Sequence, residues 1–164
     1  MKRLGFSLVL VLMVFSLAGC LIKKPPENVK ISTSGIYDMH IMRLFGESNL
    51  PKGSVLNLEI KEVERDKEVY SEILKVSNKG SFSWSDYNPN PTKEYSINLT
   101  FDPSKQSKEI QKKYGNNGEN IKKDKFAGVI TKNGKVIIQK STTLQKLGHY
   151  VVASNFILSS NMNE

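Results

Sequence analysis

The chain has 164 residues, with 24 Lys and Arg against 16 Asp and Glu, and its formal net charge is +8 at pH 7. This length fits one domain around one hydrophobic core. A single cysteine excludes a disulfide within the chain, so the fold must depend on packing, and after its first apolar run the sequence has no second one long enough to span a membrane.

The N-terminal residues have the order of a bacterial export signal. Lys2 and Arg3 precede a mostly apolar run from Leu4 to Leu17, which is too short for a permanent helix across a bilayer core of about 30 Å. The run ends in Leu17-Ala18-Gly19-Cys20. This ending resembles the lipobox of bacterial lipoproteins.

The lipobox resemblance implies diacylglyceryl transfer to the sulfur of Cys20 and cleavage between Gly19 and Cys20. Two acyl chains are enough for stable attachment to a bilayer, whereas one is marginal. We therefore expect a signal peptide over 1–19, a lipidated cysteine and tether over 20–28, and a domain over 29–164 on the extracytoplasmic face of a bacterial cell membrane. The alternative is an ordinary secretory signal that contains a chance cysteine.

Positive charge is concentrated in the second half of the chain. Residues 21–102 hold 11 basic and 12 acidic side chains, whereas residues 103–164 hold 11 basic and 4 acidic ones. Such a field favours anionic polymers or an anionic membrane surface as partners. Nearly all the basic residues are lysine, and arginine is the usual reader of phosphate and bases, so we expect no nucleic-acid partner. The alternative is a compositional bias towards Lys and Asn on a solvated face.

Period-two alternation predicts strands along most of the chain, because successive side chains of a strand point to opposite faces. One short helix is expected over Ser104–Tyr114, where Gly115 is its stop, and a polar loop follows over Gly115–Lys125. Asn133-Gly134 predicts a two-residue hairpin that pairs Ile130 with Ile137. The predicted strands contain Ile36–Phe45, Leu56–Ile60, Tyr70–Val76, Phe82–Trp84, Tyr95–Phe101, Phe126–Lys132, Lys135–Thr143 and Tyr150–Leu158.

These elements predict an all-β fold, a β-sandwich of about seven to eight strands with one short helix. Four segments in chain order also resemble a group of bacterial exported domains with an immunoglobulin-like sandwich. The resemblance covers about residues 30–145 and implies that fold, but it transfers no catalytic residue because none is established for the group. The segments are Gly46–Ser54, Gly80–Phe82, Tyr95–Leu99, and Gln106 together with Gly115–Ile121.

Catalytic and metal-binding chemistry finds little support in the sequence. It has no Gly-x-Ser-x-Gly or Ser-x-x-Lys motif, and only His40 and His149 offer an imidazole; His40 is expected within a strand. Asp86–Pro91 begins like a calcium loop but has Pro91 where Gly is needed. We expect no enzyme activity, no metal and no cofactor.

Two further features each leave two interpretations open. The acidic residues from Glu62 to Glu68 are read as a solvated turn between strands, with a cation site as the alternative. Trp84, the only tryptophan, is read as part of the sandwich core, with an exposed platform for sugar stacking as the alternative.

The Gly115–Lys125 loop and its flanks are the candidate binding region, since loops on a rigid scaffold often carry function. Its amides and ammonium groups suit an anionic glycopolymer such as a teichoic acid; the alternative is an unconstrained surface loop. The expected function is non-enzymatic binding or scaffolding at the cell envelope. The alternatives are a module that binds a partner protein at an open sheet edge and, less favoured, a sandwich-fold hydrolase. The candidate residues are Lys112, Lys113, Asn116, Asn117, Glu119, Asn120, Lys122 and Lys123.

Overall fold

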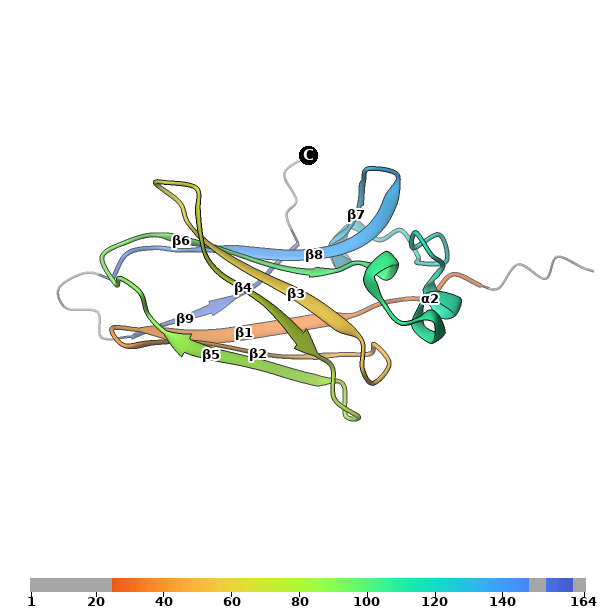
Figure 1. Cartoon of the computed structure of the whole chain (residues 1–164), viewed down its shortest axis with the longest axis horizontal. Coiled ribbons are helices and arrows are strands. Elements are labelled where there is room, and N and C mark those ends of the chain that lie inside the picture. Colours follow the sequence, from red (N-terminus) through yellow and green to blue (C-terminus); the bar gives the residue numbers. More distant parts are fainter. Residues whose placement is uncertain (1–24, 148–152, 161–164) are drawn as a thin grey trace, which may run out of the picture.

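The computed structural model describes residues 25–147 and 153–160, in which nine strands form two antiparallel sheets packed face to face (Figure 1). The predicted β-sandwich is confirmed, with more strands than expected. The four-stranded sheet has the order β5-β2-β1-β9, formed by Ser81–Tyr87, Ile41–Ser48, Ile31–Asp38 and Ala153–Ile157. The five-stranded sheet has the order β4-β3-β6-β8-β7, formed by Lys67–Lys75, Val55–Glu62, Tyr95–Phe101, Lys135–Leu144 and Val129–Lys132.

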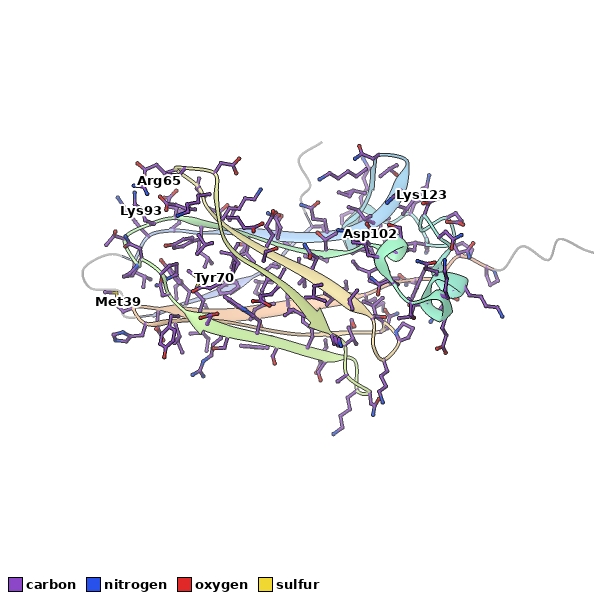
Figure 2. The ribbon with its side chains drawn as sticks, viewed as in Figure 1. Met39, Arg65, Tyr70, Lys93, Asp102 and Lys123 are labelled. Atoms are coloured by element: carbon purple, nitrogen blue, oxygen red, sulfur yellow. The ribbon has the colours of Figure 1, made fainter. Side chains whose placement is uncertain are left out.

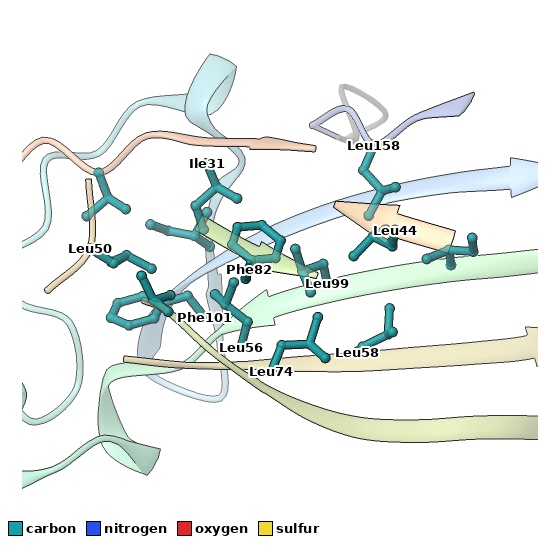
Figure 3. Packing of buried hydrophobic residues seen from close by; sticks show 14 of the residues in the cluster. Ile31, Leu44, Leu50, Leu56, Leu58, Leu74, Phe82, Leu99, Phe101 and Leu158 are labelled. Carbon is teal, nitrogen blue, oxygen red and sulfur yellow. The ribbon is translucent and has the colours of Figure 1, made fainter. Parts of the chain in front are cut away.

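The hydrophobic core lies between the two sheets and follows the predicted alternation (Figure 3). In β3 the side chains of Leu56, Leu58 and Ile60 are fully buried, and the polar residues between them point to the outer face. In β6 the same pattern buries Ile97 and Leu99. Burying one Leu or Ile side chain contributes about 1.5–3 kcal/mol, so the buried face of each strand stabilises the sandwich.

The predicted single strand over Ile36–Phe45 is wrong, because the chain reverses within it. β1 ends at Asp38, whose carboxylate accepts hydrogen bonds from the backbone N–H groups of His40 (2.7 Å) and Ile41 (2.8 Å). These bonds lower the pKa of Asp38 and close a tight turn. The side chain of Met39 is exposed in this turn. Because Met39 is apolar, the sequence pattern indicated a strand here and not a turn.

The Asn133-Gly134 hairpin between β7 and β8 is confirmed in its register. Ile130 pairs with Ile137, and Lys132 faces Lys135. Both turn residues have positive φ, 51° at Asn133 and 75° at Gly134, which is the backbone conformation that this sequence favours.

The predicted helix over Ser104–Tyr114 is two separate elements. A short 3-10 helix, η1, spans Pro103–Lys105, and α2 spans Lys108–Tyr114. Between them the amide of Gln106 accepts from the N–H of Val55 (2.8 Å) and donates to its carbonyl (3.0 Å), so this residue pairs with the start of β3 instead of continuing a helix. Gly115 ends α2 with φ 87°, as predicted.

Two tyrosines connect neighbouring segments of the sandwich. At the start of β6 the hydroxyl of Tyr95 donates to the carbonyl of Asn90 (3.0 Å). The ring of Tyr70 in β4 meets Trp84 in β5 edge to face, with centroids 5.1 Å apart. Trp84 is half-buried and packs against the core, in line with the first of its two interpretations.

The last strand, β9, pairs with β1 in the four-stranded sheet. It covers the second half of the strand expected over Tyr150–Leu158; residues 150–152 lie outside the described residues.

Candidate functional site

The polar loop after α2 lies against the segment through which the described chain enters the domain (Figure 1). The N–H of Glu27 donates to the carbonyl of Asn120 (2.6 Å), and the N–H of Lys122 donates to the carbonyl of Glu27 (2.9 Å). Glu27 and Ile121 thus form a short parallel bridge. The first described residues and the candidate binding loop are therefore one structural unit.

The loop is held in a defined shape by its own polar groups. The carboxylate of Glu119 accepts from the backbone N–H groups of Asn117 (2.8 Å) and Asn116 (3.3 Å). Together with a bond from its own N–H, these interactions lower the pKa of Glu119. The side-chain amide of Asn120 donates to the carbonyl of Lys113 (3.2 Å), which ties the loop to α2.

The loop also packs closely against β8. The N–H of Val136 donates to the carbonyl of Asn117 (2.7 Å). At Gly118, where φ is 77°, an added Cβ would lie 2.1 Å from the carbonyl oxygen of Val136. Only glycine allows this approach, so Gly118 shapes the loop that the sequence identified only as conformationally permissive.

The lysines around the loop are directed to solvent. Lys112, Lys122, Lys123 and Lys125 are exposed, and their side chains make no hydrogen bond or ion pair within the described part of the chain. The ammonium of Lys113 lies 3.6 Å from the carboxylate of Glu27 and 5.2 Å from the ring centre of Tyr114. We call the set Lys112, Lys113, Lys122, Lys123 and Lys125 the lysine-rich end.

The structure divides the predicted candidate residues into two groups. Glu119, Asn120 and Lys113 serve the protein itself, because the first two bond to the backbone and Lys113 pairs with Glu27. Lys112, Lys122 and Lys123, with the exposed residues Asn116 and Asn117, are available to a ligand. Sequence reasoning missed Phe126 as a surface residue, although its side chain is 81% exposed beside Lys125. An aromatic residue next to the lysines of the run Lys122–Phe126 could have indicated it.

The acidic segment predicted as a turn lies at the opposite end of the molecule, where Figure 2 labels Arg65 and Lys93. Glu62 forms ion pairs with Arg65 (3.5 Å) and Lys93 (3.6 Å). Lys93 also contacts Glu64 and lowers its pKa. The segment joins β3 to β4, which agrees with its interpretation as a solvated turn between strands. Among residues 25–147 and 153–160, no three His, Cys, Asp or Glu side chains come together that could hold a metal ion.

The segment that begins like a calcium loop serves the corner between β5 and β6. The carboxylate of Asp86 accepts from the N–H of Tyr87 (2.7 Å), and the amide of Asn88 donates to the carbonyl of Asp38 (2.6 Å). These side chains bond to the protein backbone and stabilise neighbouring turns.

A groove of about 380 Å³ on the outer face of the five-stranded sheet was not predicted. Both carboxylates and ammonium groups line it, and the ammonium of Lys135 donates to the hydroxyl of Ser104 (2.9 Å). The sequence pattern that could have predicted this groove is the set of polar residues that alternate with buried residues in β3 and β6. Its charged lining residues are Glu59, Asp102, Lys105, Lys132 and Lys135.

No histidine lines this groove in the part of the chain that the structure describes. His40 is exposed in the turn between β1 and β2, not within a strand as expected, and His149 lies outside the described residues. The arrangement that would favour the hydrolase hypothesis, an imidazole gathered with carboxylates in a cleft, is therefore not found among them.

Gly19 and Cys20 also lie outside the described residues, so the expected lipid anchor stays a prediction. Within residues 25–147 and 153–160, no helix has the length and apolar character needed to cross a bilayer.

No protein-family model, no curated protein and no solved structure matches this chain. Its class is therefore defined by architecture alone. It is an all-β sandwich with a lysine-rich end, built where the first described residues pack on the loop after α2.

Proposed function

We propose that the protein is a lipid-anchored, non-enzymatic binding or scaffolding module on the extracytoplasmic face of a bacterial membrane. The observation that carries this proposal is the contact between Glu27 and the loop at Asn120–Lys122, which puts the lysine-rich end where the chain arrives from Cys20. Pro25 follows Cys20 by five residues, which span at most about 18 Å. The anchor and the charged surface therefore act at the same place.

The proposed partners are anionic components of the envelope. Exposed ammonium groups attract phosphate and carboxylate polymers such as teichoic acids, and they also attract anionic lipid headgroups. Because Lys112, Lys122, Lys123 and Lys125 are exposed on the surface, we expect broad electrostatic recognition with strong dependence on salt rather than tight selection of one small molecule.

We further infer that the sandwich is immunoglobulin-like. The support is its strand order: β1, β2 and β5 are neighbours in one sheet, while β3, β6 and β8 are neighbours in the other. This is the arrangement of strands A, B and E against C, F and G. Tyr95 adds a second feature, because its hydroxyl bonds back to the carbonyl of Asn90 at the start of the strand that corresponds to F, as in a tyrosine corner.

Lipidation is tested by changing Cys20 to Ala in the native host. The natural protein is expected in the membrane fraction, with an N-terminal peptide whose mass includes a diacylglyceryl group on Cys20. The variant is expected to keep residues 1–19 and to lack the lipid, because the thioether cannot form. Recovery of the natural protein with an unmodified thiol at Cys20 would show that the anchoring proposal is wrong.

Binding is tested with the chain from residue 21 onward, which retains the whole described core from Val29 to Leu158. We expect retention on immobilised teichoic acid or anionic vesicles at about 20 mM salt, where screening is weak, and release as the salt rises. Failure to bind either material at low salt would contradict the proposed anionic partners.

A partner-protein module remains the second candidate because β4 is an edge strand of its sheet. It pairs with β3 on one side, and its Ile73 side chain is 65% exposed. An added strand at such an edge gains main-chain hydrogen bonds. Crosslinking in cells followed by mass spectrometry separates the candidates, because one stoichiometric protein crosslinked through β4 would favour this second function.

A further inference from the structure

The first described residues pack against the domain and are hydrogen-bonded to it. Pro25 and Pro26 favour an extended backbone, Glu27 is bonded on both sides to the loop, and Val29 is 2% exposed in the core. The direction in which the chain arrives is thus set by the fold. The end of the sandwich that carries α2 and the loop must face whatever holds the preceding residues.

Most of the acidic groups at this end are engaged with the protein itself. From Asp102 to Lys135 the sequence holds nine lysines and four acidic residues. Asp102 accepts from the N–H (2.8 Å) and hydroxyl (2.7 Å) of Ser104, and Asp124 accepts from the N–H of Phe126 (3.0 Å). Glu119 is bonded within its loop. Within the described residues, only Lys113 of the lysine-rich end is paired, with Glu27, whereas Lys112, Lys122, Lys123 and Lys125 are exposed to solvent.

The opposite end lacks this excess of positive charge, and Lys93 there pairs with Glu62 and Glu64. From Glu59 to Glu68, around the turn between β3 and β4, five acidic residues stand against three basic ones. Figure 1 shows this turn and α2 at the two ends of the long axis. A negatively charged surface therefore attracts the lysine-rich end more strongly than the opposite end, which orients the molecule.

Phe126 distinguishes a lipid surface from a dissolved polymer. Its backbone is fixed, because its carbonyl accepts from the hydroxyl of Ser160 (2.7 Å) and its N–H bonds to Asp124, yet its ring is 81% exposed. An exposed aromatic ring among lysines suits the boundary between headgroups and acyl chains, where both apolar and charged groups are stabilised. A polyanion in water would leave the ring exposed.

We propose that the lysine-rich end, with Phe126, lies on the anionic phospholipid surface of the membrane that holds the lipid anchor. The sandwich then stands on this end, and the turn between β3 and β4 points away from the membrane. This inference rests on the proposed lipidation of Cys20, which would keep the lysines at a high effective concentration near the headgroups.

The test uses the chain from residue 21 onward and vesicles of phosphatidylcholine, with or without about 30% phosphatidylglycerol, at about 0.1 M salt. We expect cosedimentation only with the anionic vesicles. Changing Lys122 and Lys123 to Gln should weaken binding by about tenfold or more, and Phe126→Ala should weaken it further at unchanged net charge.

A matched control removes the same charge from the other end. Lys67 and Lys146 are exposed and lie near the paired residues Glu62, Tyr95 and Leu144. Their change to Gln should leave vesicle binding within about twofold of the natural sequence. Equal losses in the two double variants would overturn the inference, since binding would then follow net charge alone.

Two further outcomes would also overturn it: binding to soluble teichoic acid but not to anionic vesicles, or an unchanged affinity of the Lys122/Lys123 variant. The inference can fail while the proposed function stands, because the full lipoprotein with these substitutions should still reach the membrane fraction through Cys20. An unmodified Cys20 would instead contradict the proposed function, whatever the vesicles show.

Discussion

The hydroxyl of Tyr95 is the buried polar group with the clearest structural role. Its side chain is 1% exposed, and its bond to the carbonyl of Asn90 closes the corner before β6. Burial raises the pKa of Tyr95 to about 12, with a further contribution from Tyr37, so the group stays protonated and remains a donor at any ordinary pH.

Tyr95→Phe should therefore lower the free energy of unfolding by about 1 kcal/mol, because the partner carbonyl loses a hydrogen bond while the ring still fills its site. Denaturant unfolding measures this loss. Tyr87→Phe is the control, since Tyr87 is 76% exposed and its hydroxyl makes no hydrogen bond within the described residues, and its effect should be within about 0.5 kcal/mol. Equal stability of the Tyr95 variant and the natural protein would show that the corner bond contributes nothing.

At the scale of elements, the loop after α2 depends on one exposed carboxylate. The pKa of Glu119 is lowered first by its own N–H and then by those of Asn117 and Asn116. A carboxylate with a lowered folded-state pKa stabilises the structure above its ordinary value of 4.5, and this contribution is lost as the pH falls through the folded-state value.

We therefore expect the amides of Asn116 and Asn117 to lose hydrogen-exchange protection as the pH falls below about 4.5, before the core strands do. Glu119→Gln should reduce their protection already at neutral pH, because a neutral amide oxygen is a weaker acceptor than a carboxylate. The control is Glu109→Gln in α2, which removes an exposed carboxylate that makes no hydrogen bond or ion pair within the described residues. Protection factors of the two amides that do not respond to pH or to Glu119→Gln would contradict this account.

The whole molecule has one core that both sheets share. Leu99 in β6 is fully buried between them. Trp84 lies in β5 of the four-stranded sheet, and its ring contacts Tyr70 in β4 of the five-stranded sheet. Leu99→Ala should lower the stability by about 2–5 kcal/mol through lost burial and a residual cavity.

Because the core is common, the fluorescence of Trp84 and the far-UV circular dichroism should give the same unfolding midpoint in the natural protein and in Leu99→Ala. Ile73→Ala is the matched control, since Ile73 lies on the outer face and is 65% exposed, so its loss should stay below about 1 kcal/mol. Separate midpoints for the two signals would show that the two sheets unfold independently.

Exposed lysines gather at one end of the molecule, whereas along the sequence their excess covers the whole second half. The excess of lysine after residue 103 is visible from composition. Its location beside Glu27 depends on the path of the chain, because the loop returns to the start of the domain only after six strands and α2.

The features of the fold that depend on residues close together in the chain were predictable from the residues alone. Alternation in Leu56–Ile60 and Tyr95–Phe101 fixed which side chains are buried, since a strand turns each successive residue to the other face. Asn133-Gly134 fixed a hairpin and its register, because few residues accept positive φ. Gly115 fixed the end of α2 for the same reason.

Contacts between residues far apart in the chain depend on the assembled fold. Gln106 bonds to Val55, 51 residues away, and so divides the predicted helix. Asp38 turns the chain where an apolar run indicated a continuous strand. The contact of Glu27 with Asn120 and Lys122, and the groove between Glu59 and Asp102, exist because two sheets close on a common core. Periodicity in the sequence indicates which face of each strand is buried. Hydrophobic packing is non-directional, so the same pattern does not indicate which strands become neighbours. The positions of the loops relative to one another therefore depend on the assembled sandwich.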